Sequence, residues 1–223
     1  MKDITGSDLF SWKKFLKLPV VGIVRNITIE DLGSILPLYQ EAGMSTMEIT
    51  MNTPGAEQMI RYATEQYGFE LNIGAGTVCN QRELEKALRA GARFIVTPIT
   101  DEHVIRICRQ EAVPVFAGAF TPAEIYKAWE AGADMVKIFP ATSLGTQYIQ
   151  DLKGPFREIK LMPTGGVNVG NCLDFLNAGA EGLGMGGQLF DKGRIRNKDW
   201  MALSIAFKCL VRKINNWQTA AVN

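Results

Sequence analysis

Short apolar runs recur along the chain, and each is followed by a polar turn and a segment with helical spacing of its apolar residues. The runs lie at residues 20–24, 47–50, 72–76, 94–97, 115–117, 135–138, 160–162 and 182–185. Their centres are about 20 to 26 residues apart, which is the length of one strand–helix unit. Because most runs are continuously apolar, we predict parallel strands that are buried on both faces.

An Ala-Gly pair leads into every second predicted strand. The glycines are Gly43, Gly91, Gly132 and Gly179, at intervals of 48, 41 and 47 residues. Glycine suits the left-handed conformation that commonly ends a helix. A repeat of two units favours a closed eight-stranded barrel, so we predict an α/β fold of the (β/α)₈ TIM-barrel class; an open, doubly wound sheet is the alternative.

Capping residues mark where helices begin. Thr28 is expected to cap a helix over 29–41, with Asp31 completing a capping box, and Thr121 with Glu124 repeats the pattern. A capping box satisfies backbone N–H groups that the first turn of a helix leaves without partners.

Two further helices are predicted at the chain ends. Residues 8–17 form an extra N-terminal helix before the first strand, and residues 200–217 form a C-terminal helix that would close the barrel. No linker or low-complexity stretch divides the chain, so residues 1–223 are expected to form a single domain.

The composition agrees with one globular domain. The 223 residues are 47% hydrophobic and 21% charged, and Lys+Arg 24 against Asp+Glu 23 gives a net charge of +1. This balance argues against nucleic acid or a membrane surface as the partner. The four cysteines, at positions 79, 108, 172 and 209, have no metal-ligand spacing, and we expect reduced thiols in a soluble, cytoplasmic protein.

Lys137 interrupts an apolar strand without an acid beside it in that strand. Removal from water lowers the pKa of a lysine, and its neutral amine can then attack a carbonyl carbon. The alternative is a strand-end lysine whose amine reaches solvent or pairs with an acid from another strand. Lys137 is therefore a candidate nucleophile.

Glu48 interrupts another apolar strand and shares its parity with Thr50, so both side chains can point inward. A carboxyl group near an imine nitrogen can carry the protons that Schiff-base chemistry requires. The alternative is a structural partner for an arginine such as Arg25. Because alternate strands supply one interior layer of a barrel, Glu48 and Lys137 are expected to lie together.

Glycine-rich turns follow the seventh and eighth predicted strands, at residues 164–167 and 184–188. In barrels, backbone N–H groups of these loops commonly bind phosphate, and a side chain would hold the anion away from them. The alternative is two tight turns without a ligand.

The single histidine, His103, falls in the predicted helix after the fourth strand. A metal-dependent aldolase or epimerase would need several His or carboxylate ligands at strand ends. We therefore expect His103 on a helix surface, and no metal or cofactor.

Four motifs carry a family resemblance: Glu-Ile-Thr at 48–50, Gly-Ala-Gly-Thr-Val at 74–78, Val-Lys-Ile-Phe-Pro at 136–140 and Pro-Thr-Gly-Gly-Val at 163–167. Together they resemble the 2-keto-3-deoxy-6-phosphogluconate (KDPG) aldolase and 4-hydroxy-2-oxoglutarate (KHG) aldolase family. The resemblance runs in unbroken order from about residue 20 to residue 190. It implies a class I aldolase on a (β/α)₈ barrel, assembled as a homotrimer.

The resemblance also implies roles for individual residues. Lys137 would form the imine, Glu48 would mediate proton transfers, and Thr77 would hold the pyruvate carboxylate. The glycine turns would hold the distal phosphate, and Phe139 and Pro98 would line the pocket. The complete set assigned to substrate binding is Arg25, Thr50, Asn52, Gly76, Thr77, Pro98, Phe139, Thr164, Gly165, Gly166, Gly186, Gly187 and Gln188.

Two positions depart from the phosphogluconate members of that family. Asn52 stands where those members carry arginine and is similar to the version in 2-keto-3-deoxy-6-phosphogalactonate aldolases; Arg25 could supply the missing guanidinium. Gln188 stands where a serine is usual, and its longer amide can still donate to phosphate. Both departures concern substrate recognition.

We therefore expect a lyase that cleaves KDPG reversibly to pyruvate and glyceraldehyde 3-phosphate, with cleavage of KHG to pyruvate and glyoxylate left open. One alternative is the phosphogalactonate aldolase. The others are a phosphosugar epimerase or synthase that forms no imine, and a non-catalytic phosphosugar-binding barrel.

Overall fold

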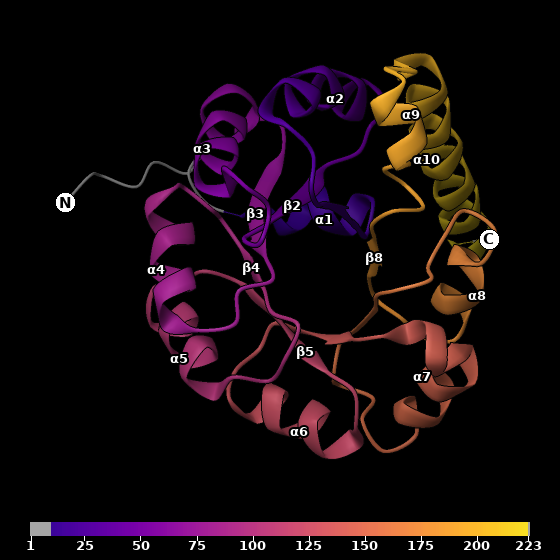
Figure 1. The fold of residues 1–223 in the computed structure, drawn as a ribbon. Coiled ribbons are helices and arrows are strands. Elements are labelled where there is room, and N and C mark those ends of the chain that lie inside the picture. The colour runs from indigo at the N-terminus through magenta and orange to yellow at the C-terminus, as the bar shows by residue number, and fades with distance from the viewer. Residues whose placement is uncertain (1–9, 223) are drawn as a thin grey trace.

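The computed structural model describes residues 10–222 and forms a barrel of eight parallel strands inside a ring of helices (Figure 1). Neighbouring strands pair in order from β1 to β7, and β8 pairs with β1. The two ends of this order meet through a bridge between Thr164 and Gly184. The predicted (β/α)₈ barrel is confirmed. The strands are β1 Val20–Val24, β2 Thr46–Thr50, β3 Asn72–Gly76, β4 Ile95–Val96, β5 Val115–Ala119, β6 Met135–Ile138, β7 Leu161–Pro163 and β8 Leu183–Met185.

The predicted strand bounds are correct for β1, β3 and β6, and the others shift by one or two residues. The largest relative difference is β4, predicted over 94–97 and observed as Ile95–Val96. Its flanks still join the hydrogen-bond ladder, because Phe94 O accepts from Ala75 N at 3.1 Å and Thr97 N donates to Phe116 O at 3.1 Å. Every strand residue is buried, as expected for parallel strands covered on both faces.

The helices lie outside the barrel and alternate with the strands. They are α1 Trp12–Lys17, α2 Ile29–Glu41, α3 Ala56–Tyr67, α4 Gln81–Arg89, α5 Glu102–Gln110, α6 Pro122–Glu130, α7 Gly145–Lys153, α8 Cys172–Asn177, α9 Lys192–Arg196 and α10 Trp200–Val222, with a 3₁₀ turn η1 at Ala141–Ser143. Both predicted capping boxes, at Thr28 and Thr121, are present.

The helices at the chain ends differ from their predictions. α1 begins at Trp12 because Ser11 caps it by accepting from Lys14 N; positions 8 and 9 of the predicted helix lie outside the described residues. α10 extends to Val222 rather than ending at 217. It packs against α2 and α9, and Trp217 Nε1 donates a hydrogen bond to Asn177 Oδ1 of α8, so α10 completes the ring of helices around the barrel, while the Thr164–Gly184 bridge joins β7 and β8.

The four Ala-Gly pairs end helices as predicted. Each alanine is a helix C-cap, and the glycines that follow have φ between 87° and 103°. A residue with a Cβ would be strained at these angles, so each glycine lets the chain turn from helix to strand.

Large side chains fill the amino-terminal end of the barrel. Phe94, Phe116, Met135 and Met162 form a buried cluster that includes Phe15 of α1. The ring centroids of Phe94 and Phe116 are 5.5 Å apart, and those of Phe15 and Phe116 are 5.6 Å apart. α1 therefore plugs this end of the barrel.

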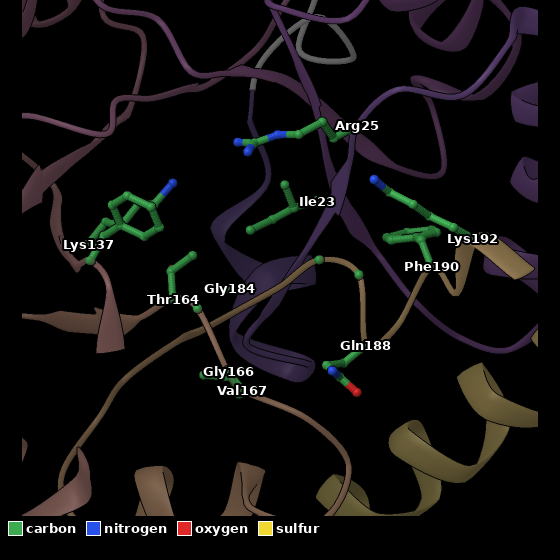
Figure 2. A pocket seen from close by; sticks show the side chains of 14 residues that line it. Ile23, Arg25, Lys137, Thr164, Gly166, Val167, Gly184, Gln188, Phe190 and Lys192 are labelled. Carbon is green, nitrogen blue, oxygen red and sulfur yellow. The ribbon is translucent and has the colours of Figure 1, made fainter. Parts of the chain in front are cut away.

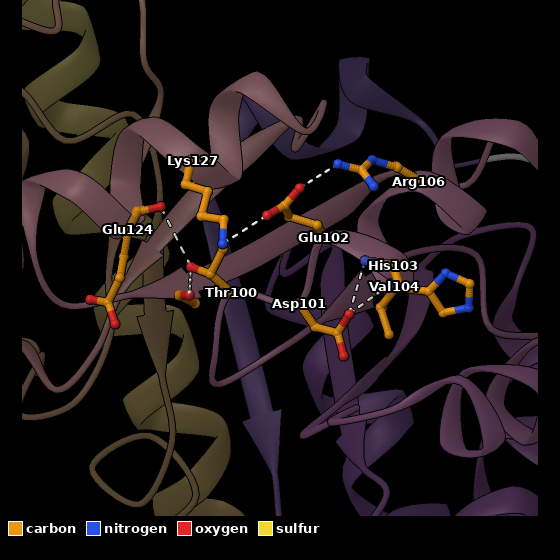
Figure 3. Close-up of polar contacts among 9 residues, drawn as sticks. Thr100, Asp101, Glu102, His103, Val104, Arg106, Glu124 and Lys127 are labelled. Carbon is orange, nitrogen blue, oxygen red and sulfur yellow. Dashed lines mark hydrogen bonds and ion pairs between the residues drawn. The ribbon is translucent and has the colours of Figure 1, made fainter.

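Polar contacts fix the start of α5 (Figure 3). Asp101 caps the helix by accepting from the backbone N–H groups of His103 and Val104, and Glu102 pairs with Arg106 on the same helix and Lys127 on α6. His103 lies on the exposed surface of α5, as predicted, and its ring Nε2 is 2.9 Å from Oε1 of Gln81.

We predict that Thr28→Ala lowers the free energy of unfolding by about 1 kcal/mol, because Thr28 Oγ1 accepts from Asp31 N at the start of α2. Thr28→Ser keeps the acceptor and should unfold like the wild type. Urea denaturation followed by circular dichroism measures both variants. Equal loss in the serine variant would show that the methyl group, not the cap, stabilises this end.

Candidate active site

A cavity of 280 Å³ opens at the carboxyl ends of β1, β6, β7 and β8 (Figure 2). Barrels of this class place their chemistry at this rim. The cavity is lined by Ile23, Arg25, Lys137, Phe139, Thr164, Gly165, Gly166, Val167, Gly184, Gly186, Gly187, Gln188, Phe190 and Lys192. Most of the residues predicted for substrate binding are therefore brought together here.

Lys137 presents its amine to this cavity from β6, and only 3% of the residue is exposed. Its Nζ lies 5.2 Å from the centroid of the Phe139 ring. Burial lowers the pKa of Lys137; the Glu48 carboxyl raises it and the Arg25 guanidinium lowers it further. The environment therefore favours the neutral amine, which is the nucleophilic form.

Glu48 lies on β2, is completely buried, and neither of its carboxyl oxygens has a hydrogen-bond partner among the described residues. Burial raises the pKa of Glu48, while the charges of Lys137 and Arg25 lower it. A Cβ at Gly76 would lie 2.4 Å from Glu48 Oε1, so the neighbouring strand leaves room for the carboxyl by carrying glycine there. Glu48 and Lys137 thus share the barrel interior, as strand parity predicts.

Arg25 follows β1, and its Nη2 donates a hydrogen bond of 3.1 Å to Thr77 Oγ1. Thr77 follows β3 and has a φ of 56°, in the left-handed region that β-branched residues rarely adopt. Strained backbone of this kind is concentrated at functional sites. The strained turn places the Thr77 hydroxyl against the guanidinium of Arg25, which lines the cavity.

Six predicted site residues do not line the cavity. Glu48 and Gly76 lie next to each other in the barrel interior. Thr77 contacts the cavity only indirectly, by accepting a hydrogen bond from Arg25. Thr50 is buried with its hydroxyl 2.9 Å from that of Thr53. The remaining two are Asn52, which is exposed in the turn after β2, and Pro98, whose backbone would lie 2.3 Å from a Cβ at Gly118.

The backbone conformation of the turn after β7 is fixed by hydrogen bonds and packing within the protein. Gly165 and Gly166 have φ of 94° and 74°, and the side-chain amides of Asn168 and Asn171 donate to the carbonyl of Gly166 at 3.1 and 3.0 Å. A Cβ at Gly166 would also lie 2.7 Å from Thr142 Oγ1. Glycine is therefore required here for both conformation and packing.

Three residues that line the cavity lie outside the predicted site residues and the two predicted glycine-rich turns: Ile23, Phe190 and Lys192. Ile23 could have been found from strand parity, because it stands two residues before Arg25, a predicted site residue. Phe190 and Lys192 carry no such signal, since the chain brings them back to the rim only through the fold of the loop between β8 and α9.

Among the described residues, no group of three or more His, Cys, Asp or Glu side chains is placed to hold a metal ion. No helix in that part of the chain is long and apolar enough to cross a membrane. All four cysteines are free thiols.

Comparisons with known proteins agree on one family. A family model described as KDPG and KHG aldolase matches residues 13–205. The chain is 36% identical over 179 residues to the 2-dehydro-3-deoxy-6-phosphogalactonate aldolase of Escherichia coli, covering 80% of this chain and 87% of that protein. It is also 36% identical over 154 residues to the 2-dehydro-3-deoxy-phosphogluconate aldolase of Pseudomonas aeruginosa, covering 67% and 70%.

A solved structure has the same fold over most of the chain. It is a cube-shaped protein cage designed by fusing symmetric oligomeric domains, with a TM-score of 0.86 and 32% identity, covering 92% of this chain and 75% of that one. The family match spans most of the chain, and the alignments cover 87% and 70% of the two relatives. The chain therefore belongs to the KDPG and KHG aldolase family and is a lyase of the aldolase class.

Proposed function

We propose that this enzyme cleaves 2-keto-3-deoxy-6-phosphogluconate reversibly to pyruvate and glyceraldehyde 3-phosphate, with Lys137 as the Schiff-base nucleophile. The observation that carries this proposal is the buried Lys137 amine at the cavity, with the unpartnered Glu48 carboxyl close enough to alter its pKa. The substrate class is supported by the names of the relatives, which are aldolases of 6-phosphorylated 2-keto-3-deoxy sugar acids.

Imine formation begins from the uncharged pair that burial favours. The neutral Lys137 amine attacks C2 of the keto acid, and a proton moves from nitrogen to oxygen to give a carbinolamine. Glu48, whose pKa is raised by burial, then donates a proton to the carbinolamine hydroxyl, which leaves as water. The product is an iminium ion on Lys137 and a carboxylate at Glu48.

Cleavage uses this iminium ion as an electron sink. The Glu48 carboxylate, acting through water, takes the proton of the C4 hydroxyl as the C3–C4 bond breaks. The electrons of that bond form an enamine, and glyceraldehyde 3-phosphate is released. Return of the proton from Glu48 to C3 and hydrolysis of the imine give pyruvate and restore the amine of Lys137.

Substrate recognition divides between the two ends of the cavity. We assign the keto-acid carboxylate to Arg25, which is held by Thr77, because a guanidinium can bind a carboxylate through two parallel hydrogen bonds. We assign the distal phosphate to the turns that contain Gly165, Gly166, Gly186 and Gly187, where backbone N–H groups are accessible.

The phosphogalactonate substrate is the second candidate. It differs from the phosphogluconate substrate in configuration at C4, the carbon from which the bond breaks. Asn52 favours this candidate, because the phosphogalactonate members are similar at that position, and the E. coli relative is an aldolase of this kind. Asn52 lies on the exposed turn after β2 and does not line the cavity.

We also propose that the chain assembles as a homotrimer and acts in the cytoplasm. Large apolar side chains are exposed after three neighbouring strands, with Ile99 at 49%, Phe120 at 40% and Phe139 at 37%. Such side chains favour burial against another subunit. The cage of fused symmetric oligomeric domains supports assembly, and a cytoplasmic location follows from phosphorylated substrates that do not cross membranes freely.

Lys137 is tested by trapping the imine. Incubation with pyruvate and borohydride should attach a stable adduct to Lys137, found by mass spectrometry of peptides. Lys137→Arg should form no adduct and should lose turnover by about 10³-fold or more. Lys160→Met, which changes an exposed lysine at the opposite rim, should still form the adduct. An active wild type without an adduct on Lys137 would instead support an epimerase or synthase that forms no imine.

Glu48 is tested by the isosteric change Glu48→Gln. Turnover should fall by about 10²- to 10⁴-fold, because the amide can neither donate nor accept the transferred proton. Prolonged incubation with pyruvate and borohydride should still label Lys137. Glu130→Gln, at an exposed acid on α6, is the matched control and should keep full turnover. Unchanged turnover in Glu48→Gln would remove this carboxyl from the mechanism.

The sugar acid is tested by coupling pyruvate release to lactate dehydrogenase with each of the two C4 epimers. We expect the higher kcat/KM on the phosphogluconate substrate, and Asn52→Arg should shift the ratio further toward it. A wild-type ratio in favour of the phosphogalactonate substrate would move the assignment to the second candidate. A folded protein that is inactive on both acids would favour the non-catalytic barrel.

A further inference from the structure

The charged residues that line the cavity are all cationic: Arg25, Lys137 and Lys192, with no acid among the lining residues. In the close-up view Lys137 and Lys192 stand on opposite sides of the cavity, and Arg25 lies above the space between them (Figure 2). A cleft lined by one sign of charge attracts ligands of the opposite sign. Lys137 is placed to react with the carbonyl, which leaves Arg25 and Lys192 to bind anionic groups at separate places.

Lys192 has no partner of its own. Within residues 10–222 no carboxylate pairs with its ammonium, and no hydrogen bond involves its side chain. The neighbouring Asp191 carboxylate is occupied, since it caps α9 by accepting from Arg194 N at 2.8 Å. α9 therefore places a free cation at the rim of the cavity, beside the loop that follows β8.

The turn beside Lys192 keeps space open that the protein does not use. A Cβ at Gly187 would meet no atom within 4 Å, and the φ of Gly187 is not in the positive region. Neither packing nor backbone conformation therefore requires glycine at this position. Gly166 differs, because its φ of 74° and the nearby Thr142 Oγ1 both require glycine. The space in front of Gly187 is thus available to a ligand that approaches the backbone.

We propose that Lys192 determines the preference of this enzyme for phosphorylated substrates by donating a charge-assisted hydrogen bond to the distal phosphate. The inference rests on the proposed function and adds a residue to it. The glycine turns supply neutral backbone donors, which also suit an uncharged hydroxyl, whereas an ammonium favours a dianion specifically. Lys192 would therefore act on phosphate affinity and leave the bond-breaking steps at Lys137 unchanged.

The test compares a phosphorylated and an unphosphorylated 2-keto-3-deoxy sugar acid. Lys192→Met should raise KM for the phosphorylated acid about tenfold with little change in kcat, because one charge-assisted hydrogen bond is lost. Kinetics on the unphosphorylated acid should be unchanged. Lys192→Arg should restore most of the preference. Lys208→Met removes an exposed lysine on α10 that does not line the cavity, and it controls for the change in net charge.

A binding measurement separates this inference from the proposed function. Titration calorimetry with glycerol 3-phosphate needs no turnover, and the Lys192→Met protein should bind it about tenfold more weakly than the wild type. If the wild type cleaves neither acid but this difference is found, the phosphate contact of Lys192 stands and the proposed function fails. Equal losses on both acids, or equal effects of Lys192→Met and Lys208→Met, would overturn the inference.

Discussion

Desolvation of Lys137 and Glu48 inside one closed barrel is the constraint on which the proposed chemistry of the site depends. In water a lysine would be a cation and a glutamate an anion, and neither would be ready for imine formation. Burial opposes both charges, while the mutual attraction of the pair restores them in part. Burial therefore favours the neutral amine and the protonated carboxyl, which are the forms that the proposed imine chemistry requires. Among the described residues, both carboxyl oxygens of Glu48 also lack the hydrogen-bond partners that a purely structural ion pair would be expected to have.

Side chains fill the two ends of the barrel interior unequally, and this leaves room for Lys137 and Glu48. Aromatic and methionine side chains, with α1 beneath them, occupy the amino-terminal end. Glycines at inward positions, such as Gly76 and Gly184, leave the other end open, and the side chains of Glu48 and Thr164 occupy the room they provide. The large residues below provide much of the stability of the core, and the small ones above let polar groups converge. The amino-terminal layer of the barrel interior thus contributes mainly to stability, and the carboxyl-terminal layer holds the candidate site.

Much of this organisation could be predicted from the sequence because it depends on local pattern. Continuous apolar runs located the strands, and the Ala-Gly pairs located helix ends with left-handed glycines. Strand parity correctly placed Glu48 and Lys137 in a shared interior. The C-terminal helix was correctly expected to complete the ring of helices, and only its extension to Val222 was not predicted. Lys192 was missed because its position depends on how a loop folds back, and exposed lysines look alike in sequence.

The two glycine-rich turns at the cavity lie beside the seam at which β7 and β8 close the barrel. β7 and β8 are joined by the Thr164–Gly184 bridge, and Leu161 O accepts from Glu181 N and Gly182 N nearer the amino-terminal end. The turn that follows β7 and the turn that follows β8 stand on either side of this seam and both face the cavity. An anion bound by both turns would therefore link β7 and β8, which are joined by a single bridge among the described residues. Binding of the substrate anion would then also stabilise the closure of the barrel between β7 and β8.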